Sequence, residues 1–315
     1  IFSDIKINNL EKKYFEIQDE INSLLISSRI SKFQKNTLGI KFSVKSNISK
    51  KRFFQIVNKA KQYIKKGDIF QVVLSQRFET KLTKKPIEIY KKLRVTNPSP
   101  FMFFFNFNDF QIIGASPEIL VRLRNNVITV RPIAGTRPRG RNNKEDNLLK
   151  KDLINDKKEL SEHLMLLDLG RNDAGKVSKI NTVKVTERFK IEKYSHVMHI
   201  VSNVTGVYDK KFSKFEALMA GFPAGTVSGA PKIRAMEIID ELEKNSRKIY
   251  AGGIGYFSAN GDFDTCIALR TAVTKNNKFY VQAGAGIVAD SKPINEYNET
   301  INKAKALIKS LEKWK

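Results

Sequence analysis

Short runs of β-branched and aromatic residues, divided by two-residue turns, are the feature of this sequence that most constrains its fold. In the last third of the chain, Asn260-Gly261 and Asn276-Asn277 separate apolar runs at 253–259, 265–274 and 279–288. An Asn-Gly pair between such runs is the strongest short-range signal for a β-hairpin. We therefore predict a three-stranded antiparallel meander in this part of the chain.

The same pattern occurs earlier, over residues 101–133, where Asn108-Asp109 and Asn125-Asn126 divide strand-like runs. This segment predicts a second antiparallel meander. Helical patterns lie before, between and after the two groups, at 53–65, 143–169, 212–219, 231–243 and 293–311. Strands grouped in this way, with helices between the groups, favour an α+β fold with largely antiparallel sheets over alternating βαβ units.

The first 46 residues differ from the rest of the chain. Apolar side chains recur at helical spacing within residues 10–30, at Tyr14, Ile17 and Ile21, and this periodicity predicts one amphipathic helix. Residues 41–51 are rich in Ser, Asn and Lys, which is typical of a linker. We therefore expect a helix-and-linker region at 1–46 and one large domain at 47–315. The chain starts with Ile1 rather than Met, so we expect 1–46 to be the remnant of a longer N-terminal region.

Charge and cysteine content restrict the function classes. The chain has 57 Lys and Arg against 32 Asp and Glu, a formal net charge of +25, which is compatible with nucleic acid or another anionic partner. The lysines are dispersed, and no zinc-finger or RNP-like motif is present, so nucleic-acid binding is a second hypothesis. A single cysteine excludes an intramolecular disulfide and is typical of a reducing cytoplasm. No apolar run approaches the ~20 residues that span a membrane.

Two predicted helices each carry glutamates three residues apart, namely Glu159 with Glu162 and Glu296 with Glu299. At 3.6 residues per turn, each pair projects from one helix face. Such pairs can be solvated surface carboxylates. They can also supply the hard oxygen ligands that suit Mg²⁺, which keeps several waters and binds together with an anionic substrate.

Three segments rich in small residues, 132–136, 222–229 and 283–286, are predicted loops. Their backbone amides can cradle carboxylate or phosphate oxygens, although tight turns explain each segment equally well. None contains a Walker or dinucleotide-binding motif. Cys266 lies in an apolar run and is a predicted core residue. Each of the three histidines, His163, His196 and His199, is either a structural residue or a catalyst.

From Lys51 onward the chain resembles the chorismate-utilising enzymes, and within that family most closely the large subunits (component I) of anthranilate synthases. The resemblance rests on long motifs in the same order, at 67–75, 97–100, 114–118, 132–140, 159–173, 196–202, 222–241, 264–270 and 282–304. It implies a single large chorismate-binding domain of two antiparallel β-sheets packed between helices.

The resemblance also implies a cytoplasmic lyase that converts chorismate and ammonia, with Mg²⁺, into anthranilate and pyruvate for tryptophan biosynthesis. Ammonia would come from a separate glutamine amidotransferase subunit (component II), in a heterotetramer. An inactive regulatory subunit is a further possibility, which the complete set of acidic and histidine residues argues against.

The resemblance also assigns roles to residues of this chain. Glu162 and Glu299 would hold Mg²⁺, with Glu159 and Glu296 in support. Glu118 would protonate the departing hydroxyl group, and His199 would act in the later loss of pyruvate. The substrate would be held by a larger set, namely Gly135, Thr136, Thr226, Tyr250, Arg270, Gly284, Ala285, Gly286 and Lys303.

Two positions distinguish sibling reactions within the family. The water-adding members, isochorismate and salicylate synthases, have a lysine base where this chain has Gln71. Aminodeoxychorismate synthases often have a nucleophilic lysine where this chain has Ala134. Because an amide and a methyl group cannot replace a reactive amine, free ammonia as the nucleophile fits best.

One half of the family's tryptophan feedback site matches Pro100, Phe101 and Met102. The other half would lie before Ile1. We therefore expect tryptophan to inhibit only a longer form of this protein.

Overall fold

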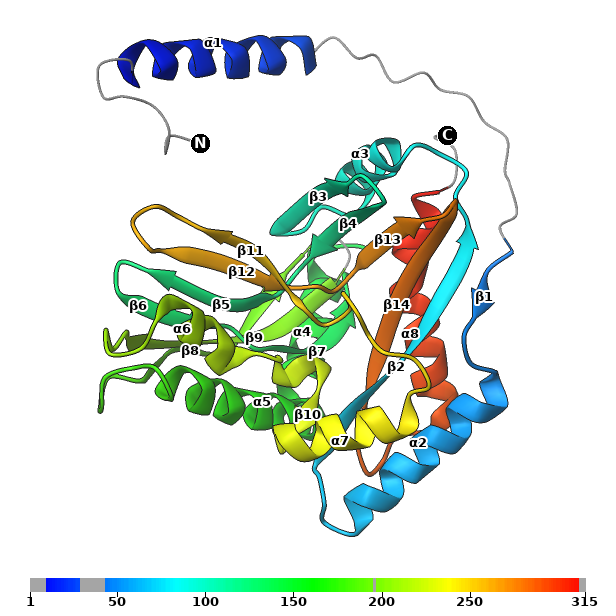
Figure 1. Cartoon of the computed structure of the whole chain (residues 1–315). Helices are drawn as coiled ribbons and strands as arrows, with labels where there is room; N and C mark the ends of the chain where they lie inside the picture. The colour runs from blue at the N-terminus through cyan, green and yellow to red at the C-terminus, as the bar shows by residue number, and fades with distance from the viewer. Residues whose placement is uncertain (1–9, 29–42, 195–196, 312–315) are drawn as a thin grey trace. The chain divides into compact units, whose positions relative to one another are not determined.

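The structure is a computed structural model of the chain, and it describes residues 10–28, 43–194 and 197–311. The described residues fall into two units, residues 10–28 in one and the other described residues in the second. In the first unit, the described part is helix α1 (Leu10–Ser28), which confirms the predicted amphipathic helix (Figure 1).

The second unit begins with a short strand rather than a free linker. Strand β1 (Lys45–Ser46) pairs with β2 (Gln71–Lys81), and α2 (Lys50–Lys65) starts directly afterwards. The Ser49 side chain accepts a hydrogen bond from the Arg52 amide and so caps α2. This helix buries Phe53, Ile56, Val57 and Ala60, the i, i+3, i+4, i+7 spacing of one helix face. The predicted linker at 41–51 therefore contains structured elements of the large domain.

Two seven-stranded antiparallel sheets form the second unit (Figure 1), as the predicted fold class requires. In the first sheet the order is β1, β2, β14 (Lys278–Ile287), β13 (Thr271–Lys275), β4 (Phe110–Ser116) and β3 (Phe101–Phe107), and β10 (Gly229–Ala230) adds to β2. In the second it is β11 (Gly253–Phe257), β12 (Phe263–Ile267), β5 (Ile119–Arg124), β6 (Val127–Val130), β9 (Val197–Val207) and β7 (Ile133–Pro138), and β8 (Lys184–Lys193) also pairs with β9.

Helices bury the apolar faces of both sheets. Residues of α2 and α7 (Lys232–Leu242) share one hydrophobic cluster with β2. A second cluster joins α3 (Pro86–Thr96) and α8 (Pro293–Lys309) to β4, β13 and β14. On the second sheet, α4 (Asn143–Asn155), α5 (Lys157–Gly175) and α6 (Lys214–Gly221) supply the covering residues. Within the described residues, no helix has both the length and the apolar character to cross a membrane.

The predicted C-terminal meander is wrong in one respect that matters for the site. Residues 265–274 do not form one strand but two, β12 and β13, which belong to different sheets. The chain crosses between the sheets at 268–270, where Arg270 adopts a left-handed backbone conformation with φ of 45°. A non-glycine residue in this region of backbone space is uncommon and is often found at functional positions.

Other corrections follow from pairings that are distant in sequence. The small-residue segments 132–136 and 283–286 lie mostly in strands, because β7 pairs with β9 and β14 pairs with β2 over ten residues. For 283–286 this agrees with the strand predicted at 279–288 and not with the predicted loop. The predicted helix at 143–169 is two helices, since the Asp156 side chain accepts from the Lys158 and Glu159 amides and caps a new helix. Helix α3 has no counterpart among the predicted elements.

Candidate active site

Four glutamates from α5 and α8 lie close enough to affect one another's ionisation. Burial raises the pKa of Glu162, and the charges of Glu159 and Glu299 raise it further, against a hydrogen bond of 2.9 Å from Gln71 Nε2. Burial also raises the pKa of Glu296, to which the charge of Glu299 adds. Glu162 and Glu296 are therefore not solvated surface carboxylates.

The donor set suits a hard divalent cation. Carboxylates that raise one another's pKa are stabilised when a cation lies between them. Within residues 10–28, 43–194 and 197–311, no three acidic, histidine or cysteine side chains are gathered into a ready-made metal cage. Mg²⁺ is usually bound by one or two carboxylates together with waters and the substrate, so Glu162 and Glu299 would suit this ion.

Glycines allow the backbone to approach these carboxylates from both sheets. Gly135 has φ of +70°, and a Cβ there would come within 3.2 Å of Glu159 Oε2. A Cβ on Gly286 would come within 2.3 Å of Gln71 Nε2 and 3.6 Å of Glu162 Oε1. Any side chain at either position would therefore occupy space beside the carboxylates.

Lys303 joins the glutamates to strand β14. Its Nζ lies 2.6 Å from Glu299 Oε1 and donates to the Gly284 carbonyl at 3.0 Å. The hydroxyl of the buried Tyr250 lies beside Gly284, 2.7 Å from the position that a Cβ at residue 284 would occupy. Ala285 follows, fully buried and paired with Leu74.

Glu118 is a buried acid near enough to Lys303 for the lysine charge to affect its ionisation. It is 6% exposed, and burial raises its pKa to about 8, while Thr226, Lys303 and Arg270 each act in the opposite direction. Glu118 and Thr226 also line one cavity of about 30 Å³. Since its pKa lies above neutral, Glu118 carries a proton at pH 7 and can donate it.

Arg270 is a cation available to a ligand. Burial lowers its pKa, while the charges of Tyr194 and Glu118 act in the opposite direction. Its guanidinium forms no ion pair with any residue that the structure describes. A guanidinium in this state can grip a carboxylate through two parallel hydrogen bonds.

His199 lies on β9 beside Gly135 and Thr136. Its Nδ1 is 3.0 Å from the Gly135 carbonyl oxygen and 3.0 Å from Thr136 Oγ1. The carbonyl can only accept, so we assign the ring proton to Nδ1, which leaves Nε2 as a free acceptor. Burial lowers the pKa of the imidazole, so the ring is neutral at pH 7.

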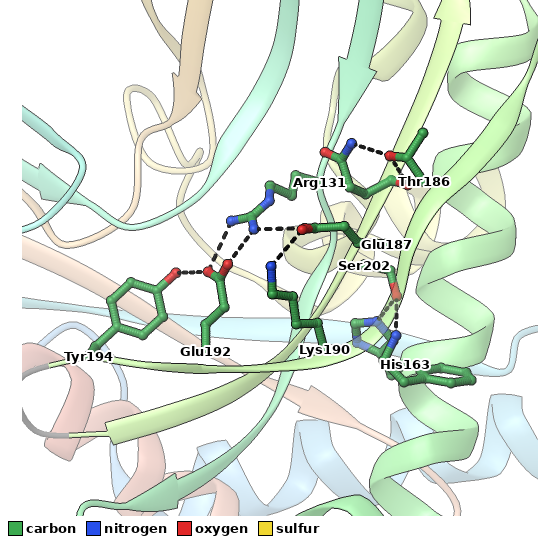
Figure 2. A network of polar contacts seen from close by, with 10 residues as sticks. Arg131, His163, Thr186, Glu187, Lys190, Glu192, Tyr194 and Ser202 are labelled. Atoms are coloured by element: carbon green, nitrogen blue, oxygen red, sulfur yellow. Dashed lines mark hydrogen bonds and ion pairs between the residues drawn. The ribbon is translucent and has the colours of Figure 1, made fainter.

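Tyr194, next to His199, belongs to a polar network with Glu192 and Arg131, and Figure 2 shows these three residues. The Tyr194 ring lies 5.5 Å from the imidazole, and its hydroxyl donates to Glu192, which is ion-paired with Arg131. The same figure shows His163, fully buried with Nε2 2.7 Å from Ser202 Oγ, a structural position. His196 lies outside the described residues.

Sequence reasoning missed some residues that surround this site. Arg137, on β7, contacts Asp152, Asp156 and Glu159 and so ties the start of α5 to the second sheet. Lys158 and Tyr194 affect the ionisation of the site residues and were not predicted. Arg137 lies within the 132–140 motif, so that motif offered a signal for it.

The residues of the expected tryptophan half-site face different ways. Phe101 packs against the cluster of Phe103, Ile112 and Cys266, whereas Met102 packs against the cluster under α3 and α8. Pro100 is exposed before β3. Their role in feedback inhibition stays a prediction.

The fold and this set of side chains define a class of protein, and the comparisons identify it. The chain belongs to the chorismate binding enzyme family, whose model matches residues 8–309. It is 61% identical to anthranilate synthase component 1 of Cereibacter sphaeroides over 85% of this chain and 54% of that protein. It is 51% identical to anthranilate synthase component 1 of Acetivibrio thermocellus over 99% of this chain and 65% of that protein.

Solved structures agree. Anthranilate synthase component I from Streptococcus pneumoniae matches with a TM-score of 0.85 and 46% identity, over 97% of this chain and 67% of that one. A putative 2,3-dihydroxybenzoate-specific isochorismate synthase from Bacillus anthracis matches with a TM-score of 0.76 and 26% identity, over 89% and 76%. The chain thus spans about half to two thirds of the length of the anthranilate synthase relatives, and the resemblance seen in the sequence is confirmed.

Proposed function

We propose that this chain carries the chorismate-converting part of an anthranilate synthase, which makes anthranilate and pyruvate from chorismate and ammonia with Mg²⁺. The observation that carries the proposal is the position of Lys303. It is ion-paired with Glu299, which raises the pKa of Glu162, and its charge also acts on Glu118. These interactions support the proposal that the candidate metal ligands and the candidate acid serve one site.

Cationic and amide groups at that site suit a substrate with two carboxylates. Arg270 would bind one carboxylate through its guanidinium. Backbone amides at 284–286 and the groups at Gly135 and Thr136 would orient the ring, with Tyr250 and Thr226 against it. Lys303 would add positive charge close to the carboxylates.

Glu162 and Glu299 would hold Mg²⁺, with Glu159 and Glu296 in support through ordered water. When bound, the ion supplies Lewis-acid stabilisation of the charge that develops on the substrate. Arg137 supports Glu159 through an ion pair and would keep α5 in place.

The chain's own residues then account for both bond changes. Ammonia adds to the ring at C2 and the C4 hydroxyl leaves, for which an acid is required because hydroxide is a poor leaving group. Glu118 would give its proton to that oxygen. The side chain of Gln71 cannot act as a base toward water, and the methyl group of Ala134 cannot act as a nucleophile, which favours ammonia over the sibling reactions.

Loss of pyruvate from the aminated intermediate would follow at His199. The free Nε2 of this neutral imidazole can accept a proton, while Nδ1–H is fixed by the Gly135 carbonyl. The Tyr194 ring packs against the imidazole in an edge-on arrangement.

The test is the product formed from chorismate with Mg²⁺ and ammonium at alkaline pH. We expect fluorescent anthranilate and pyruvate in equal amounts, and no product when EDTA is added. Isochorismate or 4-amino-4-deoxychorismate as the main product would contradict the assignment. A salt-dependent shift of labelled DNA or RNA, in place of turnover, would support the nucleic-acid alternative.

The wider context follows from the same assignment. Ammonia would come from a glutaminase partner, component II, and the reaction would belong to tryptophan biosynthesis in the cytoplasm. Co-purification of the chain with such a glutaminase, and glutamine-dependent turnover of the complex, would test the partnership.

A further inference from the structure

A buried ion pair outside the expected catalytic set joins β2, the 225–227 turn and residues 243–250. Arg247 and Glu243 have side chains only 16% and 6% exposed, and Arg247 Nη2 lies 2.7 Å from Glu243 Oε1. Neither residue is within the set that would touch substrate or metal. A buried pair of this kind contributes little net stability when compared with apolar residues, whereas loss of one partner leaves an uncompensated buried charge.

The guanidinium makes a nearly complete set of hydrogen bonds. Nε and Nη2 donate to Glu243, at 3.0 and 2.7 Å, while Nη2 also donates to the Val73 carbonyl at 2.6 Å. Nη1 donates to the Val227 carbonyl at 2.7 Å. Arg247 thus connects β2 to the 225–227 turn. In this turn Thr226 lies between Gly225, whose carbonyl accepts from the Ser228 amide, and Val227, whose carbonyl accepts from Arg247.

The same side chain supports Tyr250. The guanidinium carbon lies 5.5 Å from the centre of the Tyr250 ring, and the Tyr250 amide donates to the Arg247 carbonyl at 3.0 Å. The Tyr250 hydroxyl in turn lies on Gly284. A displaced guanidinium would therefore move the Tyr250 ring, whose hydroxyl lies beside Gly284 on β14.

Glu243, which pairs with the guanidinium, is itself held by hydrogen bonds. Its Oε1 accepts from both the amide and the hydroxyl of Ser75, at 2.7 and 2.9 Å, and Gln282 Nε2 donates to the same hydroxyl at 2.8 Å. The carboxylate is thereby held to the adjacent strands β2 and β14, two residues from Gly284.

We propose that Arg247, fixed by Glu243, is the positioning residue that holds Tyr250 and the Thr226 turn in their substrate-binding places. This inference rests on the proposed function. Lysine at position 247 keeps the charge but loses the planar fork, so it cannot hold Glu243 and both carbonyls at once. Small displacements of substrate-orienting groups have large kinetic effects.

The experiment is a double-mutant cycle of Arg247→Lys and Tyr250→Phe, with kcat and KM measured for chorismate with Mg²⁺ and ammonium. We expect Arg247→Lys to lower kcat/KM by about tenfold, chiefly through KM, in the wild-type background. In the Tyr250→Phe background, we expect less than a threefold effect, because residues that act through one another are not additive. Equal effects in both backgrounds would overturn the proposal.

A matched control separates positioning from general stability. Arg234, on the surface of α7, also pairs with two acids, Asp68 and Glu237. Its guanidinium carbon lies 5.3 Å from the centre of the Tyr63 ring. Arg234→Lys should leave kcat and KM within twofold of wild type, and equal losses in the two variants would refute a specific role for Arg247. Turnover by wild type and by this control reports the proposed function itself, independently of the cycle.

If Arg247→Lys folds poorly, two further measurements still test the proposal. Glu243→Gln keeps an acceptor for Ser75 and should show the same non-additivity with Tyr250→Phe, to a smaller degree. Amide hydrogen exchange at 225–230, measured without substrate, should be faster in Arg247→Lys than in wild type. Unchanged exchange, together with additive kinetics for Glu243→Gln, would exclude the positioning role.

Discussion

The buried carboxyl of Glu118 allows the sharpest single test of the site. Burial raises its pKa to about 8, so roughly nine tenths of the molecules carry the proton at pH 7. Glutamine at this position has nearly the same size but cannot donate a carboxylic proton. Because a positioned acid contributes roughly 10²- to 10⁴-fold to a rate, Glu118→Gln should lower kcat by that factor and leave KM nearly unchanged.

The same group predicts a pH dependence of the wild-type rate. Above the raised pKa, Glu118 loses its proton, and kcat should fall by about tenfold for each pH unit above pH 9. The assay follows anthranilate fluorescence from pH 6.5 to 10.5. Total ammonium is adjusted at each pH so that free ammonia stays constant and saturating.

The stability of the folded state should also fall with rising pH, over a lower pH range. A carboxyl group whose folded-state pKa lies above its unfolded value contributes stability that is fully present below about pH 4.5 and is lost as the pH rises through about 8. The free energy of unfolding should therefore fall by up to ~1.4 kcal/mol per pH unit between these values in wild type. In Glu118→Gln this contribution is absent, so urea unfolding should show a flatter pH dependence. Wild-type turnover by the variant, or a flat wild-type kcat profile up to pH 10, would refute the role of Glu118 as the acid.

Three further changes test the remaining groups of the pocket. Glu162→Gln should remain folded but lose at least about 100-fold in turnover, with poor rescue by excess Mg²⁺, and turnover at the wild-type rate would refute its role as a ligand. His199→Met should accumulate the aminated intermediate, detectable by chromatography, whereas normal anthranilate output would exclude His199 from the second step. Gly286→Ala places a Cβ 2.3 Å from Gln71 Nε2 and should lower kcat/KM by about 100-fold with little change in melting temperature, so an active variant would show that this approach is not required.

Local patterns predicted much of the fold. Most of the turn-bounded strand runs and the long amphipathic helices of the prediction occur close to the expected positions, because hairpin turns and helical periodicity are encoded by nearby residues. The acidic pairs of α5 and α8 were likewise visible from their spacing. Their approach to one another could not be derived from spacing, because it depends on how two helices pack against different sheets.

The errors share one physical cause. The segments 132–136 and 283–286 contain small residues that are typical of loops, but their pairing with β9 and β2 makes most of each segment a strand. The break at 268–270 lies within an apolar run that has no turn residues. Only the positions of the two sheets explain why the chain changes direction at Arg270, and local composition does not contain that information.

Arg247 illustrates the same limit. Its partners Val73, Val227 and Glu243 come from separate parts of the chain, and two of the contacts are with backbone carbonyls. Sequence patterns do not predict backbone acceptors, so this residue was identified only from the structure.

The central claim is that carboxylates of α5 and α8 jointly bind one divalent ion beside the substrate pocket. Crystals of the protein soaked with Mn²⁺ and chorismate, measured at the manganese absorption edge, test this claim most directly. We expect one anomalous peak bound to both Glu162 and Glu299, and its loss in Glu162→Gln crystals. A peak elsewhere, or none at these two glutamates in crystals that hold chorismate, would contradict the account.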